Sequence, residues 1–174
     1  DRVYLWGFWV DDGVTEPYYR SFASFTDLDE QQEQALARAA MGWLREMVAG
    51  RTSLVFHYSD YELIRLQRLT QPGDEVLEWA NAYAKKHFVD LFTVVKTNFF
   101  GANGLGLKVV ASAGAGFHWR DDDPGGLNSM IWFDEAVHGA DPDVRAQTTQ
   151  RVLDYNEDDV RATWALRRWL RLQP

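Results

Sequence analysis

The pattern of hydrophobic and polar positions predicts a hairpin at the start of the chain. Residues 3–10 and 17–24 are rich in aromatic and β-branched side chains, which are typical of strands. Between them lies Asp11-Asp12-Gly13, and Asp-Gly is a common hairpin turn. We therefore expect two antiparallel strands, with Asp11 and Asp12 as turn residues.

Helical spacing of the hydrophobic positions begins after this hairpin. Residues 28–48 carry an apolar stripe that consists of Leu36, Ala40, Trp43, Leu44 and Met47. Gly50 marks the expected end of this helix.

The remainder of the chain alternates short apolar runs with helical stretches. Strands are expected at 53–58 and 87–91, and loops at 101–106 and 120–126. Helices are expected at 60–69, 74–86, 107–114, 127–138, 142–153 and 155–171. Because strands lead and helices follow, we expect an α/β fold with a mixed sheet flanked by helices, in one domain that spans residues 1–174.

Composition narrows the chemistry that the chain can support. The chain of 174 residues contains no cysteine, which excludes disulfides and thiolate metal sites. A metal ion would therefore be bound by carboxylate, imidazole or carbonyl groups, and carboxylates suit Mg²⁺ or Mn²⁺. The net charge of −8 argues against a basic nucleic-acid footprint, but clustered metal-binding carboxylates would also make the charge negative.

Targeting features are not visible in the sequence. No apolar run approaches the length of a membrane span and no signal peptide is visible, so we expect a cytoplasmic protein without a membrane partner. The chain begins at Asp1 and runs directly into a strand-like segment, so we expect it to be a fragment of a longer protein.

One carboxylate stands out on the last predicted helix. A face with spacings of three and four contains Tyr155, Asp159, Ala162, Leu166 and Leu170. Asp159 lies within this inward stripe, whereas we expect Glu157 and Asp158 to be solvated. Because burial of an unpaired carboxylate is costly, Asp159 needs a metal ion, an arginine or a backbone cap as its partner. The alternative is a partly exposed acid that favours a helix N-terminus.

A second candidate lies in His57-Tyr58-Ser59-Asp60-Tyr61-Glu62, which joins a predicted buried strand to a helix. Ligands collect at the C-terminal ends of strands in α/β sheets, and Glu62 would face that edge. Ser59 and Glu62 also have the spacing of a capping box, which explains Glu62 without chemistry. Both interpretations stay open, and His57 is most simply a half-buried residue at a strand end.

Other acidic residues carry weaker signals. Asp90 ends the next predicted strand, where it is either a strand terminus or helix N-cap, or a neighbour of Glu62 at the same edge. The run Asp121-Asp122-Asp123 lacks the spacing of a calcium-binding loop and predicts a solvated loop.

The order of these segments resembles a known family. The stretches HYSDYE, FVDLF, LGLKVVASAGAG and YNEDDVRATWALRRWL are similar to those of YprB-type ribonuclease-H-like domains, and the resemblance covers nearly the whole chain. These domains belong to the DnaQ-like, or DEDD, 3′–5′ exonuclease superfamily and accompany RecB-like nucleases. The most specific element is Tyr-x-x-x-Asp, here Tyr155 and Asp159.

This resemblance implies a metal-dependent nuclease that hydrolyses phosphodiester bonds from a 3′ end with two Mg²⁺ or Mn²⁺ ions. It implies that Glu62 and Asp159 are metal ligands and that Tyr155 orients the attacking water or the phosphate. Asp90 and His57 would have supporting roles. In the second motif of the family, Tyr58 stands in place of Asn and Glu62 in place of Asp.

The same resemblance implies particular partners. DNA or RNA, expected to be single-stranded, would be the substrate, and an upstream RecB-like nuclease domain or a helicase would be a protein partner.

The first motif of the family is missing from the chain. Asp-x-Glu belongs on a strand that precedes the hairpin, and no such pair is present there. We expect this first strand to lie upstream of Asp1. One alternative is a catalytically inactive ribonuclease-H-like module that binds nucleic acid or a partner domain, and another is an unrelated α/β domain.

Overall fold

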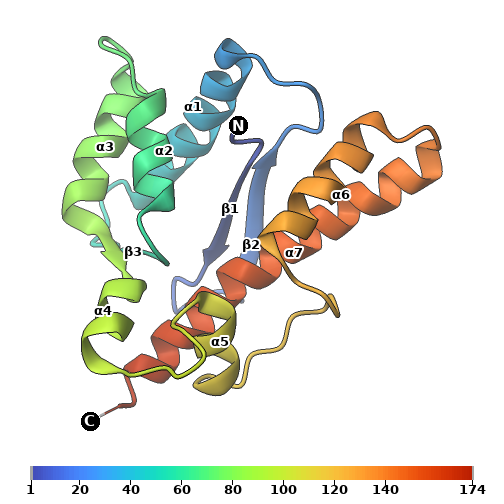
Figure 1. Ribbon diagram of the computed structural model, residues 1–174. Coiled ribbons are helices and arrows are strands. Elements are labelled where there is room, and N and C mark those ends of the chain that lie inside the picture. Colours follow the sequence, from blue (N-terminus) through green and yellow to red (C-terminus); the bar gives the residue numbers. More distant parts are fainter. Residues whose placement is uncertain (1, 174) are drawn as a thin grey trace.

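The computed structural model describes residues 2–173, which form helices around two small sheets (Figure 1). The elements are β1 (Leu5–Val10), β2 (Tyr18–Ala23), α1 (Glu30–Val48), β3 (Val55–His57), α2 (Tyr61–Leu69), α3 (Glu75–His87), β4 (Phe88–Asp90), α4 (Leu91–Asn98), α5 (Leu107–Ala113), α6 (Gly126–His138) and α7 (Pro142–Leu170). The predicted α/β class is confirmed.

Strands β1 and β2 form the expected antiparallel hairpin, with a register that runs from Leu5↔Ala23 to Val10↔Tyr18. The Asp12 carboxylate accepts hydrogen bonds from the backbone N–H groups of Val14 and Thr15 and so closes the turn. The prediction that Asp12 is a turn residue is therefore confirmed.

Strands β3 and β4 form a separate parallel pair, in which Val55 pairs with Phe88 and His57 with Asp90. Within residues 2–173 the strands therefore form two two-stranded sheets rather than the one mixed sheet that the sequence predicts. Helix α7 contacts both β1 and β3, so one helix is packed against both sheets.

The main hydrophobic core lies between the hairpin and helices α1, α2 and α3, which Figure 1 shows side by side. Its largest fully buried side chains include Met41, Leu66 and Leu77. The predicted stripe of α1 is partly correct, because Ala40 and Leu44 are buried while Trp43 is only partly buried. Among residues 2–173, no helix has the length and apolar character needed to cross a bilayer.

Helix α7 differs from the prediction. It is one continuous helix from Pro142 to Leu170, not two helices that meet near residue 154. Asp141 caps its N-terminus and Pro142 occupies the first turn, both common at helix starts. Tyr155 and Asp159 therefore lie in the middle of a helix rather than at its beginning. Helix α4 is an element that the sequence pattern did not predict, and Asp90 is its N-cap.

A glycine lets α7 approach the hairpin closely. A Cβ atom on Gly7 would lie 1.7 Å from Asn156 Oδ1, which accepts a hydrogen bond from the Tyr19 hydroxyl at 2.8 Å. We expect Gly7→Ala to displace the Asn156 side chain, break this bond and lower the free energy of unfolding by about 1–2 kcal/mol.

Urea unfolding measures this effect, and Gly42→Ala is the matched control. Gly42 lies in α1, and a Cβ atom there would meet no other atom within 4 Å, so alanine should stabilise the protein by about 0.5–1 kcal/mol. An unchanged or raised stability of Gly7→Ala would contradict the close approach.

Candidate functional site

The turn between β3 and α2 brings two strand ends to the start of a helix. His57 and Asp90 are paired at the ends of β3 and β4. Ser59 follows with a φ of 78°, a conformation that non-glycine residues seldom adopt. The Ser59 backbone N–H donates to Asp90 Oδ1 at 2.9 Å, and this bond fixes the direction in which α2 begins.

Glu62 is not part of a capping box. The N-cap of α2 is Asp60, whose side chain makes no capping hydrogen bond, so the capping box suggested by Ser59 and Glu62 is absent. The Glu62 side chain is 43% exposed, but its Oε2 atom is buried and has no hydrogen-bond partner among the described residues. The nearest basic atom is Nδ1 of His57, at 3.8 Å. An unpartnered buried carboxylate oxygen favours the ligand interpretation over the capping interpretation.

The surroundings of Glu62 oppose its ionisation. Burial, together with the negative charges of Asp90, Asp159 and Asp60, raises the pKa of Glu62 from 4.5 to about 7. Asp159 is therefore close enough to Glu62 for their charges to interact, although α2 and α7 are far apart in sequence. This region has an excess of negative charge that a bound cation would relieve.

This raised pKa makes the stability of the protein depend on pH. The folded state binds the Glu62 proton more tightly than the unfolded state, so its stabilising contribution is complete below pH 4.5 and is lost as pH rises through about 7. The full shift corresponds to about 3 kcal/mol, but screening at a 43% exposed side chain reduces the expected contribution to about 1 kcal/mol.

Urea unfolding in EDTA at pH 5, 6, 7 and 8 measures this contribution. We expect Glu62→Gln to flatten the fall in stability between pH 5 and pH 8. If the variant and the unchanged protein have parallel pH profiles, Glu62 does not carry the raised pKa.

Polar side chains surround the carboxylate of Asp159 on α7. Trp119 Nε1 donates to Asp159 Oδ1 at 2.8 Å. Burial raises the pKa of Asp159, although Lys108 and hydrogen bonds with Trp119 and Tyr155 act in the opposite direction. The carboxylate is therefore held in one orientation by neighbours from α5, from α7 and from the loop before α6.

Tyr155 lies one turn before Asp159 and its side chain is buried. Its hydroxyl accepts a hydrogen bond from Lys108 Nζ at 2.6 Å, and its ring meets the ring of Trp132 edge-on at 5.7 Å. Burial and the charge of Asp159 raise the pKa of Tyr155, so the phenol stays protonated at neutral pH. It can orient a ligand by hydrogen bonding.

The other acidic residues of this helix differ from the prediction that they are solvated. Asp158 is 2% exposed, not solvated, and accepts hydrogen bonds from the backbone N–H and the Nε of Arg120 at 2.8 and 2.9 Å. Arg120 also binds Glu157 at 2.9 Å and lies 3.5 Å from Asp154. Spacing selected Asp159 correctly as inward-facing but wrongly placed Asp158 in solvent, because the partner that buries Asp158 lies in a distant loop.

Asp90 and His57 have structural contacts beside Glu62. Asp90 accepts hydrogen bonds from Ser59 N, Phe92 N and Thr93 Oγ1. Burial raises the pKa of Asp90, but these hydrogen bonds outweigh it and the net pKa is lowered. His57 is buried, and its Nδ1 donates to the Ser59 carbonyl at 2.6 Å, because a carbonyl can only accept. Both residues shape the turn that carries Glu62.

Tyr58 links this turn to the loop before α5. Its hydroxyl donates to the Leu105 carbonyl, and its ring lies 5.6 Å from the ring of Phe92. Burial raises the pKa of Tyr58 to about 12. This residue therefore connects the two segments that carry Glu62 and Lys108.

Sequence reasoning missed Lys108 and Trp119. Lys108 lies within LGLKVVASAGAG, and its position in that stretch was the only available signal. The sequence carried no signal for Trp119, because its contact with Asp159 spans 40 residues of sequence.

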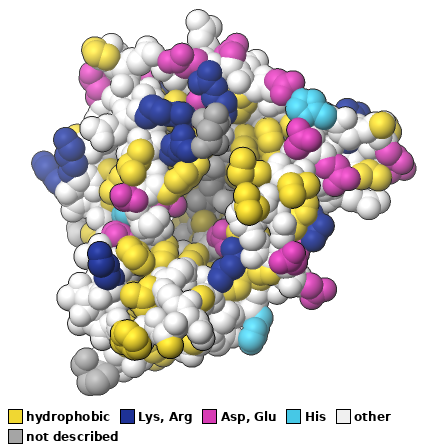
Figure 2. All heavy atoms as spheres, viewed as in Figure 1, with side chains coloured by type: hydrophobic (Ala, Val, Ile, Leu, Met, Phe, Trp, Pro, Cys, Tyr) yellow, Lys and Arg dark blue, Asp and Glu magenta, His cyan; other side chains and the backbone are white. Residues whose placement is uncertain are grey.

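A pocket borders part of this site. Figure 2 shows the molecule hollowed at its centre, with hydrophobic, acidic and basic side chains around the hollow. One pocket of about 170 Å³ is lined in part by Tyr4, Tyr61, Ser129, Tyr155 and Asn156, and so reaches the α7 face that carries Tyr155.

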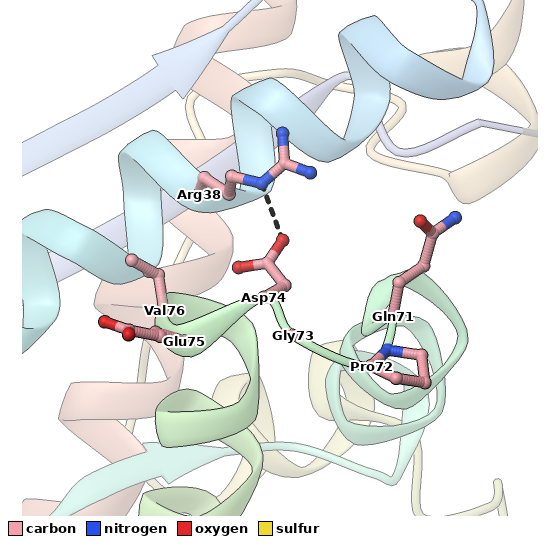
Figure 3. A pocket seen from close by; sticks show the side chains of 7 residues that line it. All are labelled: Arg38, Gln71, Pro72, Gly73, Asp74, Glu75 and Val76. Atoms are coloured by element: carbon pink, nitrogen blue, oxygen red, sulfur yellow. Dashed lines mark hydrogen bonds and ion pairs between the residues drawn. The ribbon is translucent and has the colours of Figure 1, made fainter.

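The larger pocket, of about 360 Å³, lies at the start of α3 (Figure 3). There Arg38 Nε binds Asp74 Oδ2 at 2.6 Å, and Asp74 also caps α3. Arg38 and Asp74 are thus used in folding contacts, and none of the predicted site residues lines this pocket.

The donor set fits a divalent cation in part. Residues 2–173 contain no group of three histidine, aspartate or glutamate side chains placed to hold a metal ion. Mg²⁺, however, is commonly held by one or two protein carboxylates together with water and substrate phosphate. The unpartnered Oε2 of Glu62 and the nearby Asp159 suit such a partial set.

The comparisons with known proteins agree with this architecture. A family model described as the RNase H superfamily matches residues 1–171. Neither the curated proteins nor the solved structures contain a match to this chain. Because the family match covers nearly the whole chain and the fold is mixed α/β, this protein belongs to the RNase H superfamily.

Proposed function

We propose that this chain is a metal-dependent nuclease that removes nucleotides from the 3′ end of DNA or RNA. Membership of the RNase H superfamily suggests a nuclease-type function. The observation that carries the proposal is the buried Oε2 of Glu62, which lacks a hydrogen-bond partner and lies in the field of Asp159. A divalent cation is the natural partner for two carboxylates that otherwise repel each other.

In this proposal, Glu62 and Asp159 hold Mg²⁺ or Mn²⁺, which supplies an activated nucleophile and stabilises the leaving oxygen when bound. Trp119 keeps Asp159 in place through its 2.8 Å hydrogen bond. The protonated Tyr155 hydroxyl orients water or a phosphate oxygen. His57 and Asp90 fix the turn that presents Glu62.

The remaining ligands are proposed to come from an Asp-x-Glu strand. Among residues 2–173, β1 pairs only with β2 and β3 pairs only with β4. Both sheets contact α7. A strand that pairs with the open edge of β1 or β3 would bring its carboxylates near α7.

Further parts of the proposal rest on the sequence alone. The resemblance supports single-stranded nucleic acid as the proposed substrate and a RecB-like nuclease domain or a helicase as the proposed partner. The cytoplasm is the proposed location, as expected from a sequence in which no signal peptide is visible.

Cleavage assays test the proposal with 3′- and 5′-labelled single-stranded and duplex DNA and RNA. We expect EDTA-sensitive release of nucleotides from the 3′ end with Mg²⁺ or Mn²⁺. A chain that carries an added Asp-x-Glu strand ahead of Arg2 is expected to cleave faster. The absence of metal-dependent cleavage from both forms would overturn the proposal.

A catalytically inactive nucleic-acid-binding module is the second candidate. It is favoured by the absence of a three-ligand group within residues 2–173. Filter binding with the same oligonucleotides separates the two candidates. An inactive module would bind the oligonucleotides without cutting them, both as the unchanged chain and as the chain with the added Asp-x-Glu strand.

A further inference from the structure

Lys108 provides a positive charge at the edge of the acidic site. It lies in the first turn of α5, and its Nζ is 2.6 Å from the Tyr155 hydroxyl. The same Nζ lies 4.8 Å from the centre of the Tyr155 ring and 5.8 Å from that of Trp119. These contacts hold the ammonium group between the two aromatic rings, next to Asp159.

Most of the N–H donors of the Lys108 ammonium group make no hydrogen bond among the described residues. An ammonium group has three N–H donors, and one hydrogen bond of Lys108 Nζ is found among the described residues. No carboxylate of residues 2–173 lies within salt-bridge distance of Nζ. By contrast, the nearby Arg120 is committed to Asp154, Glu157 and Asp158. Lys108 is therefore placed to bind an anionic ligand without first breaking an ion pair.

An anionic ligand can approach this acidic site only if a positive charge, such as that of Lys108, lies beside it. Asp90 and Asp159 are both close enough to act on the charge of Glu62, and the chain as a whole carries a net charge of −8. A phosphate that approaches these carboxylates is repelled unless positive charge accompanies it. A metal ion at Glu62 and Asp159 would supply part of this charge, and Lys108 lies on the Tyr155 side of Asp159.

We propose that Lys108 binds a non-bridging oxygen of the substrate phosphate beside the metal ion, with Tyr155 and Trp119 holding its ammonium group in position. This inference rests on the proposed nuclease function and adds a phosphate-binding residue to it. The competing explanation is that Lys108 only offsets the charge of Asp159 and so stabilises the fold.

These two roles predict different binding results. If Lys108 binds the phosphate, its removal should weaken the binding of thymidine 5′-monophosphate and leave the binding of Mn²⁺ alone unchanged. A lysine that only neutralises Asp159 competes with the metal, so its removal should change Mn²⁺ affinity and leave the discrimination between nucleotide and nucleoside unaltered.

The experiment uses isothermal titration of the whole chain with Mn²⁺, and then with thymidine 5′-monophosphate or thymidine in the presence of Mn²⁺. We expect Lys108→Met to weaken thymidine 5′-monophosphate binding about 10–100-fold, the usual worth of a charge-assisted hydrogen bond. Mn²⁺ binding should stay unchanged. Lys108→Arg should retain most of the affinity for the monophosphate.

Lys96→Met is the matched control, because it removes the same charge from an exposed position on α4. It should leave all three affinities unchanged. Thermal melting identifies any variant that does not fold, and Lys108→Gln then provides a second removal of the charge.

The outcomes separate the two proposals. If the unchanged protein binds Mn²⁺ but Lys108→Met and Lys108→Gln retain full affinity for the monophosphate, the Lys108 inference is wrong and the nuclease proposal stands. If the unchanged protein binds neither Mn²⁺ nor the monophosphate, both are wrong.

Discussion

Asp159→Asn is expected to reduce metal-dependent cleavage by about 10²–10⁴-fold, because a bound metal contributes several kcal/mol of transition-state stabilisation. The substitution keeps the size of the side chain, and Asn Oδ1 can still accept from Trp119 Nε1. It removes the negative charge that would bind the cation. The fold should be retained, since Asp159 has a raised pKa and ionises against the cost of burial.

Initial rates of nucleotide release at saturating Mn²⁺ measure this loss. Asp154→Asn is the control, because Asp154 lies on the same helix, is 39% exposed and faces Arg120. It should retain cleavage within about twofold, as a screened surface charge. If Asp159→Asn cleaves as fast as the control variant, Asp159 is not a metal ligand.

Asp158→Asn is expected to have the opposite consequence, a large loss of stability without a direct loss of metal binding. Asp158 is 2% exposed and accepts two hydrogen bonds from Arg120. Removal of its charge leaves Arg120 facing the less buried Asp154 and Glu157 and turns one acceptor oxygen into a donor opposite an N–H. Breaking a buried pair costs about 3–5 kcal/mol, and because Arg120 is 45% exposed we expect about 2–3 kcal/mol.

Urea unfolding at pH 7 measures the loss, and Glu157→Gln is the matched control. Glu157 binds the same guanidinium at 2.9 Å but is 22% exposed, so its substitution should cost less than about 1 kcal/mol. Mn²⁺ affinity of the folded Asp158→Asn protein should remain within a few-fold of the unchanged protein. Equal stabilities of the two variants would show that burial does not distinguish these acids.

The elements of the fold were predictable where the pattern was long and regular. The hairpin followed from two strand-like runs around Asp11-Asp12-Gly13, and the apolar spacing of residues 28–48 predicted α1. The break near residue 154 was wrong, because the stretch contains no glycine or proline and a capped helix continues through it. Helix α4 was missed although Asp90 was named as a possible helix N-cap, because its eight residues include the β-branched Thr93, Val94 and Val95, which are not typical of helices.

For the candidate site, helical spacing placed Tyr155 and Asp159 on one face, and the apolar run before His57 placed Glu62 near a strand end. The choice between a capping box and an unpartnered carboxylate at Glu62 was not available from spacing. It depended on Ser59 adopting a left-handed conformation, in which its backbone N–H donates a hydrogen bond to Asp90 at the neighbouring strand end.

The sequence by itself determined the α/β class, the helix face that carries Asp159 and the turn that carries Glu62, because these depend on local periodicity and turn chemistry. Only the tertiary structure decided that Asp158 is buried against Arg120, that Trp119 and Lys108 surround Asp159 and Tyr155, and that an oxygen of Glu62 has no partner. These contacts join residues about 40 positions apart or more, and their energies depend on burial and charge in three dimensions, which spacing along one helix does not encode.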